Sequence, residues 1–327
     1  MNEPLVSIII PVYNAAAYLD ETIQSALNQT WPNKEIIIVD DGSTDNSLEI
    51  AGKYRSARVG IYHQANKGAS NARNTGLKHC TGDFIQFLDG DDLLGNEKIE
   101  KQLKVIAGQN ETLAIGDIVY FNHGSDPYKS SAGKEWYDDT CFEPIDFLIK
   151  LYGGALIGEN YGGMISIHSW LTPKSVLQKA GEWNEELTVN DDGEFFCRAV
   201  LAGRRVCHIP GALNYYRKFE SKGSLSSRKD IDAAKSVLKT IDLLAETMLS
   251  KTDGPTARIV LGRLYWENAF NFYPSHRQLA AEAIKKAKKL APGLKYDLYH
   301  KGLNQKLAAL LGWKTVRYLQ HVKSKIR

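Results

Sequence analysis

The sequence predicts an α/β fold in which a mostly parallel sheet is flanked by helices, followed by an α-helical C-terminal region. A nearly continuous apolar run at 5–12 is typical of a strand buried on both faces of a parallel sheet. Further runs of this kind alternate with helical patterns as far as residue 87, which is the order of a helix-covered parallel sheet. From residue 229 onward the apolar residues recur with helical period.

The elements expected from these patterns follow the chain in order. The strands are expected at 5–12, 35–39, 59–63, 83–87, 113–121, 164–170, 205–209 and 212–217. The helices between them are expected at 15–28, 46–56, 68–80, 96–107, 144–152, 173–181 and 192–203. The C-terminal helices are expected at 230–250, 255–272, 275–290, 294–311 and 313–325. Polar or Gly-rich loops are expected at 122–140 and 153–163. We therefore expect a catalytic domain over 1–228 and a helical region over 229–327.

Composition narrows the possible functions. The net charge of +3 is too small to indicate a nucleic-acid partner. Met1-Asn2-Glu3-Pro4 leads straight into a strand, and no apolar run approaches the roughly 20 residues that span a bilayer. The four cysteines show no CxxC or metal-ligand spacing, so buried thiols in a reducing compartment are expected. These features predict a cytoplasmic protein, and peripheral contact with the inner face of the membrane stays open.

The most informative motif is the acidic run Asp89-Gly90-Asp91-Asp92, which follows the expected strand 83–87. Ligands of open α/β sheets lie beyond the carboxyl ends of the strands. Mg²⁺ takes one or two protein carboxylates and completes its shell with water and substrate phosphates. The run therefore predicts a site for Mg²⁺ or Mn²⁺ at Asp89 and Asp91, with Gly90 giving the turn its backbone freedom. The alternative is an ordinary turn whose carboxylates cap the following helix.

Three further polar loops are expected at the same rim, because parallel strands end at one edge of a sheet. Together they offer an aromatic ring, carboxylates and cations, which suit the base and phosphates of a nucleoside diphosphate. Each side chain also has a structural alternative as a packed aromatic, a turn residue or a solvated charge. The candidate binding residues in these loops are Pro11, Tyr13, Asn14, Asp40, Asp41, Lys67 and Arg73.

Missing motifs exclude other nucleotide-binding classes. No GxGxxG follows the first strand, which disfavours a dinucleotide dehydrogenase. No Walker A sequence is present, which excludes a P-loop NTPase. The Arg-bearing glycine-rich loop of sugar nucleotidyltransferases is also missing after the first strand.

Four motifs together resemble family 2 of the inverting glycosyltransferases. They are Ser-Ile-Ile-Ile-Pro-Val-Tyr-Asn (7–14), Ile-Val-Asp-Asp-Gly-Ser-Thr-Asp (38–45), Asn-Lys-Gly-Ala-Ser-Asn-Ala-Arg-Asn (66–74) and Leu-Asp-Gly-Asp-Asp (88–92). The resemblance covers about 5–225 and implies the nucleotide-diphospho-sugar transferase (GT-A) fold. It implies that Pro11, Tyr13 and Asp40 contact the nucleobase. It further implies that Arg73 contacts the base or diphosphate, and that Asp89 and Asp91 contact the ribose and the metal.

A second acidic cluster, Asp191-Asp192-Gly193-Glu194, opens the helix expected at 192–203. Sugar transfer with inversion needs a carboxylate that takes the proton of the acceptor hydroxyl. By resemblance, Asp192 matches the catalytic base of the family and Asp191 matches its acidic neighbour. The alternative is that either aspartate only caps the helix. Arg198 is expected to pair with these acids rather than to take part in catalysis.

Two other segments contribute candidate residues. Trp170 is expected either in the sugar or acceptor pocket or in the core. Residues 216–226 resemble the segment that closes over the diphosphate, and Arg217 is the candidate phosphate contact there. Many relatives carry His where this chain has Phe219, so a metal contact from that position is in doubt; Arg217, Lys222 and Ser224 are possible compensating residues.

The sequence thus predicts a metal-dependent glycosyltransferase that moves one sugar from a nucleotide-sugar, with UDP favoured, to a glycan, a lipid-linked acceptor or another hydroxyl. The Gln-x-x-Arg-Trp motif of processive members is missing, which favours single transfers. Cell-surface glycan, glycolipid or other polysaccharide biosynthesis is the expected setting. The alternative is a non-catalytic nucleotide-sugar or glycan-binding scaffold. From residue 285 to the end, twelve Lys and Arg face one acid, so the C-terminal helices either pack as an ordinary subdomain or bind anionic lipid.

Overall fold

The computed structural model describes residues 3–109, 111–138, 140–219, 228, 230–294 and 303–326. Contacts divide the chain into two compact units, one of 1–147 with 163–227 and one of 148–162 with 228–327. The domain boundary near residue 228 stays a prediction, and the contacts additionally group 148–162 with the helical residues. The two units are described separately.

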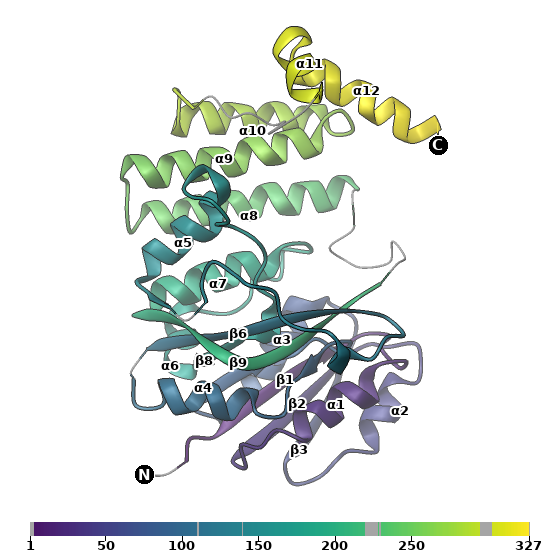
Figure 1. Cartoon of the computed structure of the whole chain (residues 1–327). Coiled ribbons are helices and arrows are strands. Elements are labelled where there is room, and N and C mark those ends of the chain that lie inside the picture. Colours follow the sequence, from purple (N-terminus) through teal and green to yellow (C-terminus); the bar gives the residue numbers. More distant parts are fainter. Residues whose placement is uncertain are drawn as a thin grey trace. The chain divides into compact units, whose positions relative to one another are not determined.

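The first unit is built on one mixed, mostly parallel sheet with the strand order β3-β2-β1-β4-β8-β6-β9-β5, and β7 pairs with β9 (Figure 1). β1, β2, β3 and β4 are mutually parallel, and β6 runs parallel to β9. β8 is antiparallel to both of its neighbours. The strands are β1 (Val6–Val12), β2 (Lys34–Asp41), β3 (Val59–Gln64), β4 (Phe84–Phe87), β5 (Leu93–Leu94), β6 (Thr112–Asn122), β7 (Cys141–Phe142), β8 (Trp170–Pro173) and β9 (Arg205–Lys218).

The central strand β1 shows why its sequence reads as a continuous apolar run. Its alternate residues face opposite sides of the sheet. Ile8 and Ile10 belong to one core cluster together with residues of α1, α2 and α4. Ile9 faces α3, where a Cβ added to Gly76 would lie 2.3 Å from an Ile9 methyl carbon. Helices therefore cover both faces of β1, and apolar residues are needed at every position.

The helices of this unit match the expected ones within a few residues. They are α1 (Leu19–Leu27), α2 (Ser47–Gly52), α3 (Ala69–His79), α4 (Lys98–Ile106), α5 (Pro144–Gly153, which runs into the second unit), α6 (Lys174–Ala180) and α7 (Asp191–Ala202). Short 3₁₀ turns lie at Pro127–Lys129, Gly154–Leu156 and Ile167–Ser169. The fold class predicted from the sequence is confirmed.

Three local expectations were wrong. The strand expected at 164–170 begins only at Trp170, because residues 167–169 form a 3₁₀ turn. The two strands expected at 205–217 are one long strand, β9, because β6 pairs along its whole length with one register shift. Finally, four free thiols were expected, but Cys141 of β7 faces Cys207 of β9 in register and the two form a disulfide. Cys80 and Cys197 are buried free cysteines, as expected.

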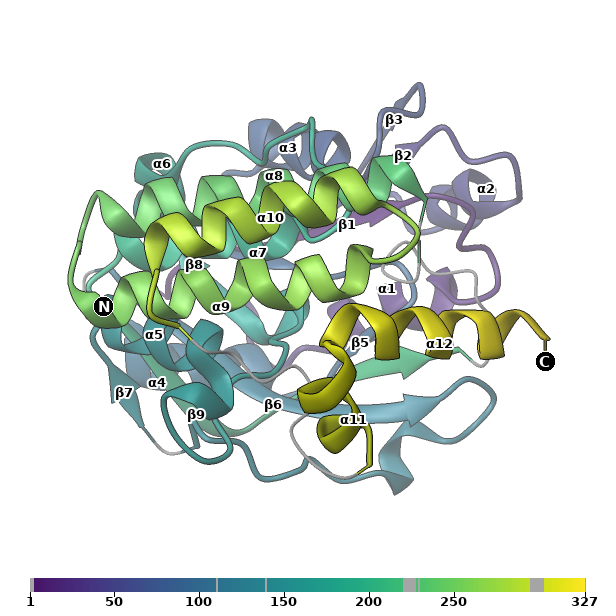
Figure 2. The same cartoon turned by 90° about the horizontal axis from the view of Figure 1, so that it is seen from above.

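The second unit is helical. Its helices are α8 (Ile231–Leu249), α9 (Pro255–Phe272), α10 (Arg277–Leu290), α11 (Leu303–Leu311) and α12 (Trp313–Ile326). Figure 2 shows α8, α9 and α10 lying side by side. Asp242 of α8 links them, because it accepts hydrogen bonds from Tyr265 of α9 (2.6 Å) and Lys286 of α10 (2.7 Å). Residues 295–302, within the helix expected at 294–311, lie outside the described residues. Among the described helices, none has an apolar stretch long enough to cross a membrane.

Candidate active site

The polar loops of the first unit meet at one edge of the sheet, because β1, β2 and β4 are parallel. Val12 at the end of β1 pairs with Asp40 of β2, and Asp40 pairs with His63 of β3. Phe87 at the end of β4 pairs with Ile9 of β1. The loops that follow these strands therefore lie next to one another, as the sequence predicted.

The first two loops surround Asp40. Its carboxylate is buried and accepts from the Ser43 N–H (3.3 Å), while His63 Nδ1 lies 2.8 Å from the same oxygen, Oδ2. The other oxygen, Oδ1, is buried without a partner in the structure. A buried acceptor left unpaired is costly, so this oxygen is suited to a donor on a ligand. Tyr13 follows Val12, which pairs with Asp40 across the two strands, and its side chain is 53% exposed.

Asn14 joins the same two loops. Its backbone has a positive φ of 50°, its N–H donates to Ser43 Oγ (3.1 Å), and its side-chain oxygen accepts from the Thr44 N–H (2.8 Å). Asn tolerates this left-handed conformation better than most residues. Asn14 therefore fixes the loop that carries Tyr13, in addition to any contact with a ligand.

Asp41 holds the third loop. Its carboxylate accepts from the backbone N–H of Lys67 (2.9 Å) and of Gly68 (2.8 Å), and from the Gln64 side chain (2.8 Å). Lys67 itself is exposed. All of these bonds are internal, so the structure gives Asp41 a positioning role for the loop that leads into α3.

Arg73 of α3 is the link between the acidic clusters. Its guanidinium is nearly buried and donates to Asp89 Oδ1 (2.9 Å) and to Asp191 Oδ2 (2.9 Å). The guanidinium carbon also lies 4.6 Å from the centroid of the Trp183 ring. Burial opposes its charge, but Asp89, Asp191 and Asp192 outweigh this effect and raise the pKa of Arg73. Two carboxylates far apart in the sequence thus share one buried cation.

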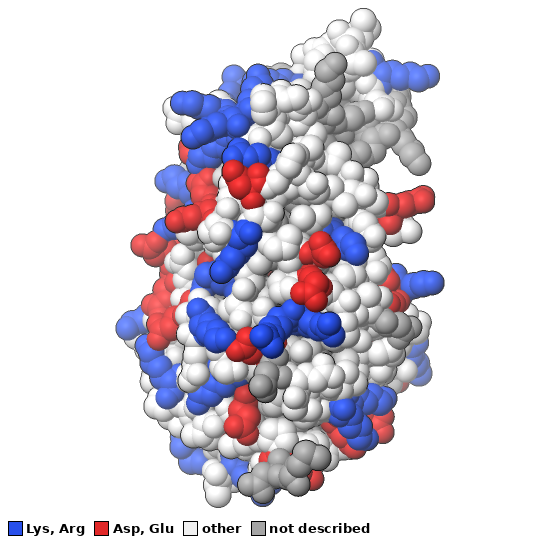
Figure 3. All heavy atoms as spheres, turned by 90° about the vertical axis from the view of Figure 1, so that its left-hand side faces the viewer, with Lys and Arg blue, Asp and Glu red and all other residues white. Residues whose placement is uncertain are grey.

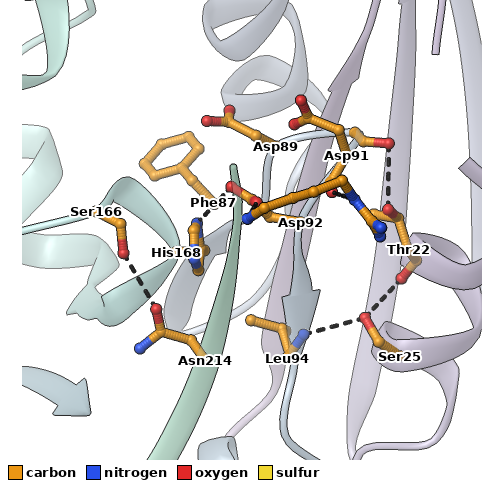
Figure 4. Close-up of polar contacts among 12 residues, drawn as sticks. Thr22, Ser25, Phe87, Asp89, Asp91, Asp92, Leu94, Ser166, His168 and Asn214 are labelled. Carbon is orange, nitrogen blue, oxygen red and sulfur yellow. Dashed lines mark hydrogen bonds and ion pairs between the residues drawn. The ribbon is translucent and has the colours of Figure 1, made fainter. Parts of the chain in front are cut away.

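The acidic run at the end of β4 sends its carboxylates in two directions. Figure 4 shows Asp89 and Asp91 pointing to one side and Asp92 pointing toward His168. Burial, reinforced by the negative charge of Asp89, raises the pKa of Asp91 to about 6. A cation bound at this place would relieve that repulsion. A Cβ at Gly90 would lie 3.2 Å from the Pro11 carbonyl oxygen, so a small residue is needed where the turn approaches β1.

Asp92, the third carboxylate of the acidic run, has a structural role. It accepts from the backbone N–H of Arg217 (2.7 Å), and its other oxygen lies 3.2 Å from Nδ1 of the fully buried His168. Burial and the charges of Asp91 and Asp89 raise its pKa well above the ordinary value. Arg217 Nε donates to the Asp91 carbonyl (2.8 Å), and its guanidinium forms an ion pair with Glu21. Through these contacts of Arg217, the end of β9 is bonded to the acidic turn.

The second acidic cluster opens α7, as predicted. Asp191 accepts from Arg73 and from Ser70 Oγ (2.7 Å). Burial and the neighbouring Asp191 raise the pKa of Asp192 to about 6, and Arg73 partly opposes this shift. Arg198 makes two hydrogen bonds to Glu194 (2.6 and 2.7 Å) and also donates to backbone carbonyls, which is a structural role. Asp192 is therefore the carboxylate of this cluster that has no arginine bonded to it.

Two other candidates lie in packed surroundings. Trp170 is 2% exposed and stacks on Phe196 with ring centroids 4.6 Å apart, so it belongs to the core, the second of its two alternatives. It was proposed as a binding residue, and this burial speaks against that role. Phe219 packs against Tyr18 and His123, with centroids 5.3 and 5.6 Å away. Lys222 and Ser224 lie outside the described residues.

Two contributing residues, His63 and Trp183, were missed from the sequence, and His168 was singled out without a role being assigned to it. His63, His168 and Trp183 each support a predicted residue, namely Asp40, Asp92 and Arg73. His63 follows from register, since it pairs directly with Asp40 across two parallel strands. His168 and Trp183 approach from distant segments, and no local pattern marks them.

A separate group of possible metal ligands lies on β6, β9 and the loop before β7. One ligand atom from each of Asp117, Asp138 and His208 lies within 4.8 Å of the others. His208 Nε2 is 2.8 Å from Asp117, whose other oxygen accepts from the Gly211 N–H (2.6 Å). Burial opposes the charge of Asp117, but these bonds outweigh it and lower its pKa. The group contains neither Asp89 nor Asp91.

A mostly parallel sheet flanked by helices, with acidic clusters at the carboxyl ends of its strands, is the arrangement expected of the nucleotide-diphospho-sugar transferase type of fold. Comparison with known proteins agrees: residues 7–165 match the family model described as glycosyl transferase family 2. Residues 7–165 are therefore similar to this family, which confirms the resemblance predicted from the motifs.

Curated relatives of the chain are described as glycosyltransferases. An uncharacterized glycosyltransferase of Haemophilus influenzae is 42% identical over 47% of this chain and 59% of its own length. The uncharacterized glycosyltransferase EpsJ of Bacillus subtilis is 34% identical over 66% of this chain and 61% of its own length. Glycosyltransferase GlyG of Streptococcus pneumoniae is 29% identical over 78% of this chain and 84% of its own length. The chain thus spans about three fifths of the first two relatives.

Solved structures support the fold. TarS residues 1–349 of S. aureus superpose with a TM-score of 0.66 at 18% identity, covering 97% of this chain and 91% of that one. The same protein in complex with UDP gives a TM-score of 0.67 at 18% identity, with the same coverage. Its complex with UDP-GlcNAc gives 0.59 at 19% identity, covering 90% of this chain and 93% of that one.

Proposed function

We propose that the protein is a metal-dependent, inverting glycosyltransferase of the hexosyl- or N-acetylhexosaminyltransferase type. It would move a single sugar from a nucleotide-diphospho-sugar, with a UDP-sugar favoured, to an acceptor hydroxyl. The observation that carries the proposal is Arg73, which bonds both Asp89 of the first acidic cluster and Asp191 of the second. These two bonds support a diphosphate site and a catalytic carboxylate that lie next to each other at the edge of the sheet.

The proposal that the donor is a uridine nucleotide rests on Asp40 and Tyr13. Its unpaired buried oxygen suits the N–H of a uracil, and the exposed Tyr13 offers a ring on which a base can stack. Pro11 and Asn14 would frame the base, and Lys67 would lie near the phosphates. TarS, which shares the fold, was solved with UDP and with UDP-GlcNAc, and this favours a uridine nucleotide here.

Asp89 and Asp91 fit a divalent ion such as Mg²⁺ or Mn²⁺. Their carboxylates point to the same side, and burial together with the charge of Asp89 raises the pKa of Asp91. A bound ion would supply electrostatic stabilisation to the departing diphosphate. Of the protein's own residues, Arg73 restrains Asp89, while Arg217 holds the backbone carbonyl of Asp91. Gly90 keeps the turn close enough to β1 for both carboxylates to face the donor.

Asp192 would act as the general base. In the reaction, the acceptor hydroxyl loses its proton to the Asp192 carboxylate as its oxygen bonds to the anomeric carbon. The bond from that carbon to the diphosphate breaks on the opposite side, so the configuration inverts. A carboxyl with a pKa of about 6 is a better base near neutral pH than one with an ordinary value, and it is still ionised there. Asp191, bonded to Arg73 and Ser70, would hold the first turn of α7 in place.

The acceptor and the biosynthetic process are proposed from the class of enzyme, a glycosyltransferase. We propose a glycan, lipid-linked or other hydroxyl acceptor at the cytoplasmic side of cell-surface glycan, glycolipid or polysaccharide biosynthesis, and no nucleic-acid partner. On the face shown in Figure 3, basic and acidic side chains are interspersed rather than gathered into one field of positive charge.

A donor panel tests the proposal. The full chain is incubated with UDP-, GDP- and dTDP-sugars with Mn²⁺, Mg²⁺ or EDTA, and release of nucleoside diphosphate is measured. We expect release from one or more UDP-sugars, loss of release with EDTA, and loss in Asp192→Asn. Donor binding without turnover in any condition would favour a non-catalytic scaffold. Pyrophosphate release from a nucleoside triphosphate and sugar phosphate would indicate a nucleotidyltransferase.

A further inference from the structure

The C-terminal helix α12 packs on the helical unit through one face. The Trp313 ring contacts Phe270 and Tyr273, with centroids 5.9 and 5.6 Å away. Val316 is 3% exposed, and the Arg317 guanidinium lies 4.5 Å from the Phe270 ring. These contacts fix which side of α12 faces α9.

The opposite side of α12 is apolar and exposed. Tyr318, Leu319 and Val322 are 45%, 56% and 37% exposed. At about 100° per residue, these three lie within about 100° of one another, away from Trp313. At the end of α11, Leu310 and Leu311 add 80% and 49% exposed side chains. We call these five residues the apolar face; Figure 2 shows α11 and α12 in contact at their junction.

Basic residues border the apolar face. On the helical projection, Lys314 and Lys323 fall about 40° outside its two edges. Both side chains are exposed, as is Lys306 on α11. Residues 304–324 contain four Lys or Arg and no Asp or Glu. Lysines at this position can lie along apolar surface while their ammonium groups reach phosphate.

We propose that the apolar face of α11 and α12 inserts into the surface of an anionic lipid bilayer, with the bordering lysines on the lipid phosphates. A helix with an apolar side, flanking cations and no acids binds in the plane of such a surface. Another protein would need a matching acidic and apolar surface, whereas a bilayer supplies both properties along the whole length of the face. The inference needs neither the donor site nor transfer activity.

Vesicle sedimentation of the full chain tests this inference, with sucrose-loaded vesicles of phosphatidylcholine alone or with 25% phosphatidylglycerol. We expect binding to the anionic vesicles, and loss of most of it in 0.5 M salt. Leu310→Gln with Leu319→Gln should lower the partition coefficient at least tenfold. Lys314→Gln with Lys323→Gln should lower it about 25-fold, at about fivefold per lysine.

The control variants use exposed residues of the first unit, of which Leu48 and Val105 are 38% and 41% exposed. Leu48→Gln with Val105→Gln, and Lys53→Gln with Lys129→Gln, should leave vesicle binding unchanged. Equal binding to neutral and anionic vesicles would overturn the proposal, as would binding that the Leu310 and Leu319 changes do not reduce. A dimer in solution that these same changes dissociate would also overturn it, because the face would then be an interface between copies. Nucleoside diphosphate release from a soluble donor should persist in all four double variants, which separates this test from that of the proposed function.

Discussion

Asp192→Asn should slow transfer severely and yet stabilise the fold at neutral pH. Burial and Asp191 raise the pKa of Asp192 from 3.8 to about 6. The folded chain therefore keeps a proton that the unfolded chain releases, and stability is lost as the pH rises from about 4 to 6. A shift of about two units corresponds to roughly 3 kcal/mol above pH 6. We therefore expect Asp192→Asn to raise the free energy of unfolding by about 1–3 kcal/mol at neutral pH.

Thermal unfolding and turnover measure the two effects in one preparation. At pH 7.5 the melting temperature of Asp192→Asn should rise by a few degrees. Its kcat should fall by about 10²–10⁴, the usual contribution of a general base. The wild-type kcat should decline as the pH falls through about 6, whereas the residual rate of Asp192→Asn should not show this decline. Asp232→Asn, in the first turn of α8, is the control and should keep full activity. An Asp192→Asn variant with near wild-type turnover would refute the assignment of the base.

Three further outcomes are expected. Arg73→Gln leaves two carboxylates without their buried cation and should lower the free energy of unfolding by about 3–5 kcal/mol in denaturant titrations, which is more than Arg73→Lys should. A variant Arg73→Gln as stable as the wild type would contradict the ion pairs of Arg73 with both carboxylates. Asp40→Asn should weaken UDP binding about tenfold by calorimetry, because a charge-assisted hydrogen bond is lost, and an unchanged affinity would remove Asp40 from the base pocket. Cys141→Ser with Cys207→Ser should lower stability by about 2–4 kcal/mol, and alkylation of native Cys141 without reductant would disprove the disulfide.

The sequence was most informative where local pattern and function coincide. The strands β1, β2 and β4 are apolar because helices cover both of their faces, and polar residues can follow only where the strands end. That is why Asp40, Asp89 and Arg73 could be placed at one edge without coordinates. The helices of the second unit were predicted by their period alone.

What the sequence could not reveal depends on contacts between distant segments. The sequence near residue 170 does not indicate whether Trp170 faces a binding site or the core. Trp170 lies in the core because it stacks on Phe196 of α7, a distant residue in the sequence. The Cys141–Cys207 disulfide depends on β7, a strand of two residues too short to have a period. The buried pair of His168 and Asp92 likewise requires β4 and the turn at 167–169 to be neighbours in space.

The central claim is that Asp89 and Asp91 bind a metal together with a nucleoside diphosphate. The most direct measurement is a thermal-shift panel of UDP, GDP and dTDP, each with and without Mn²⁺, on the wild type and on Asp91→Asn. We expect UDP to raise the melting temperature of the wild type only when Mn²⁺ is present, and to leave Asp91→Asn unchanged. A UDP shift that is the same without metal, or in Asp91→Asn, would contradict the account.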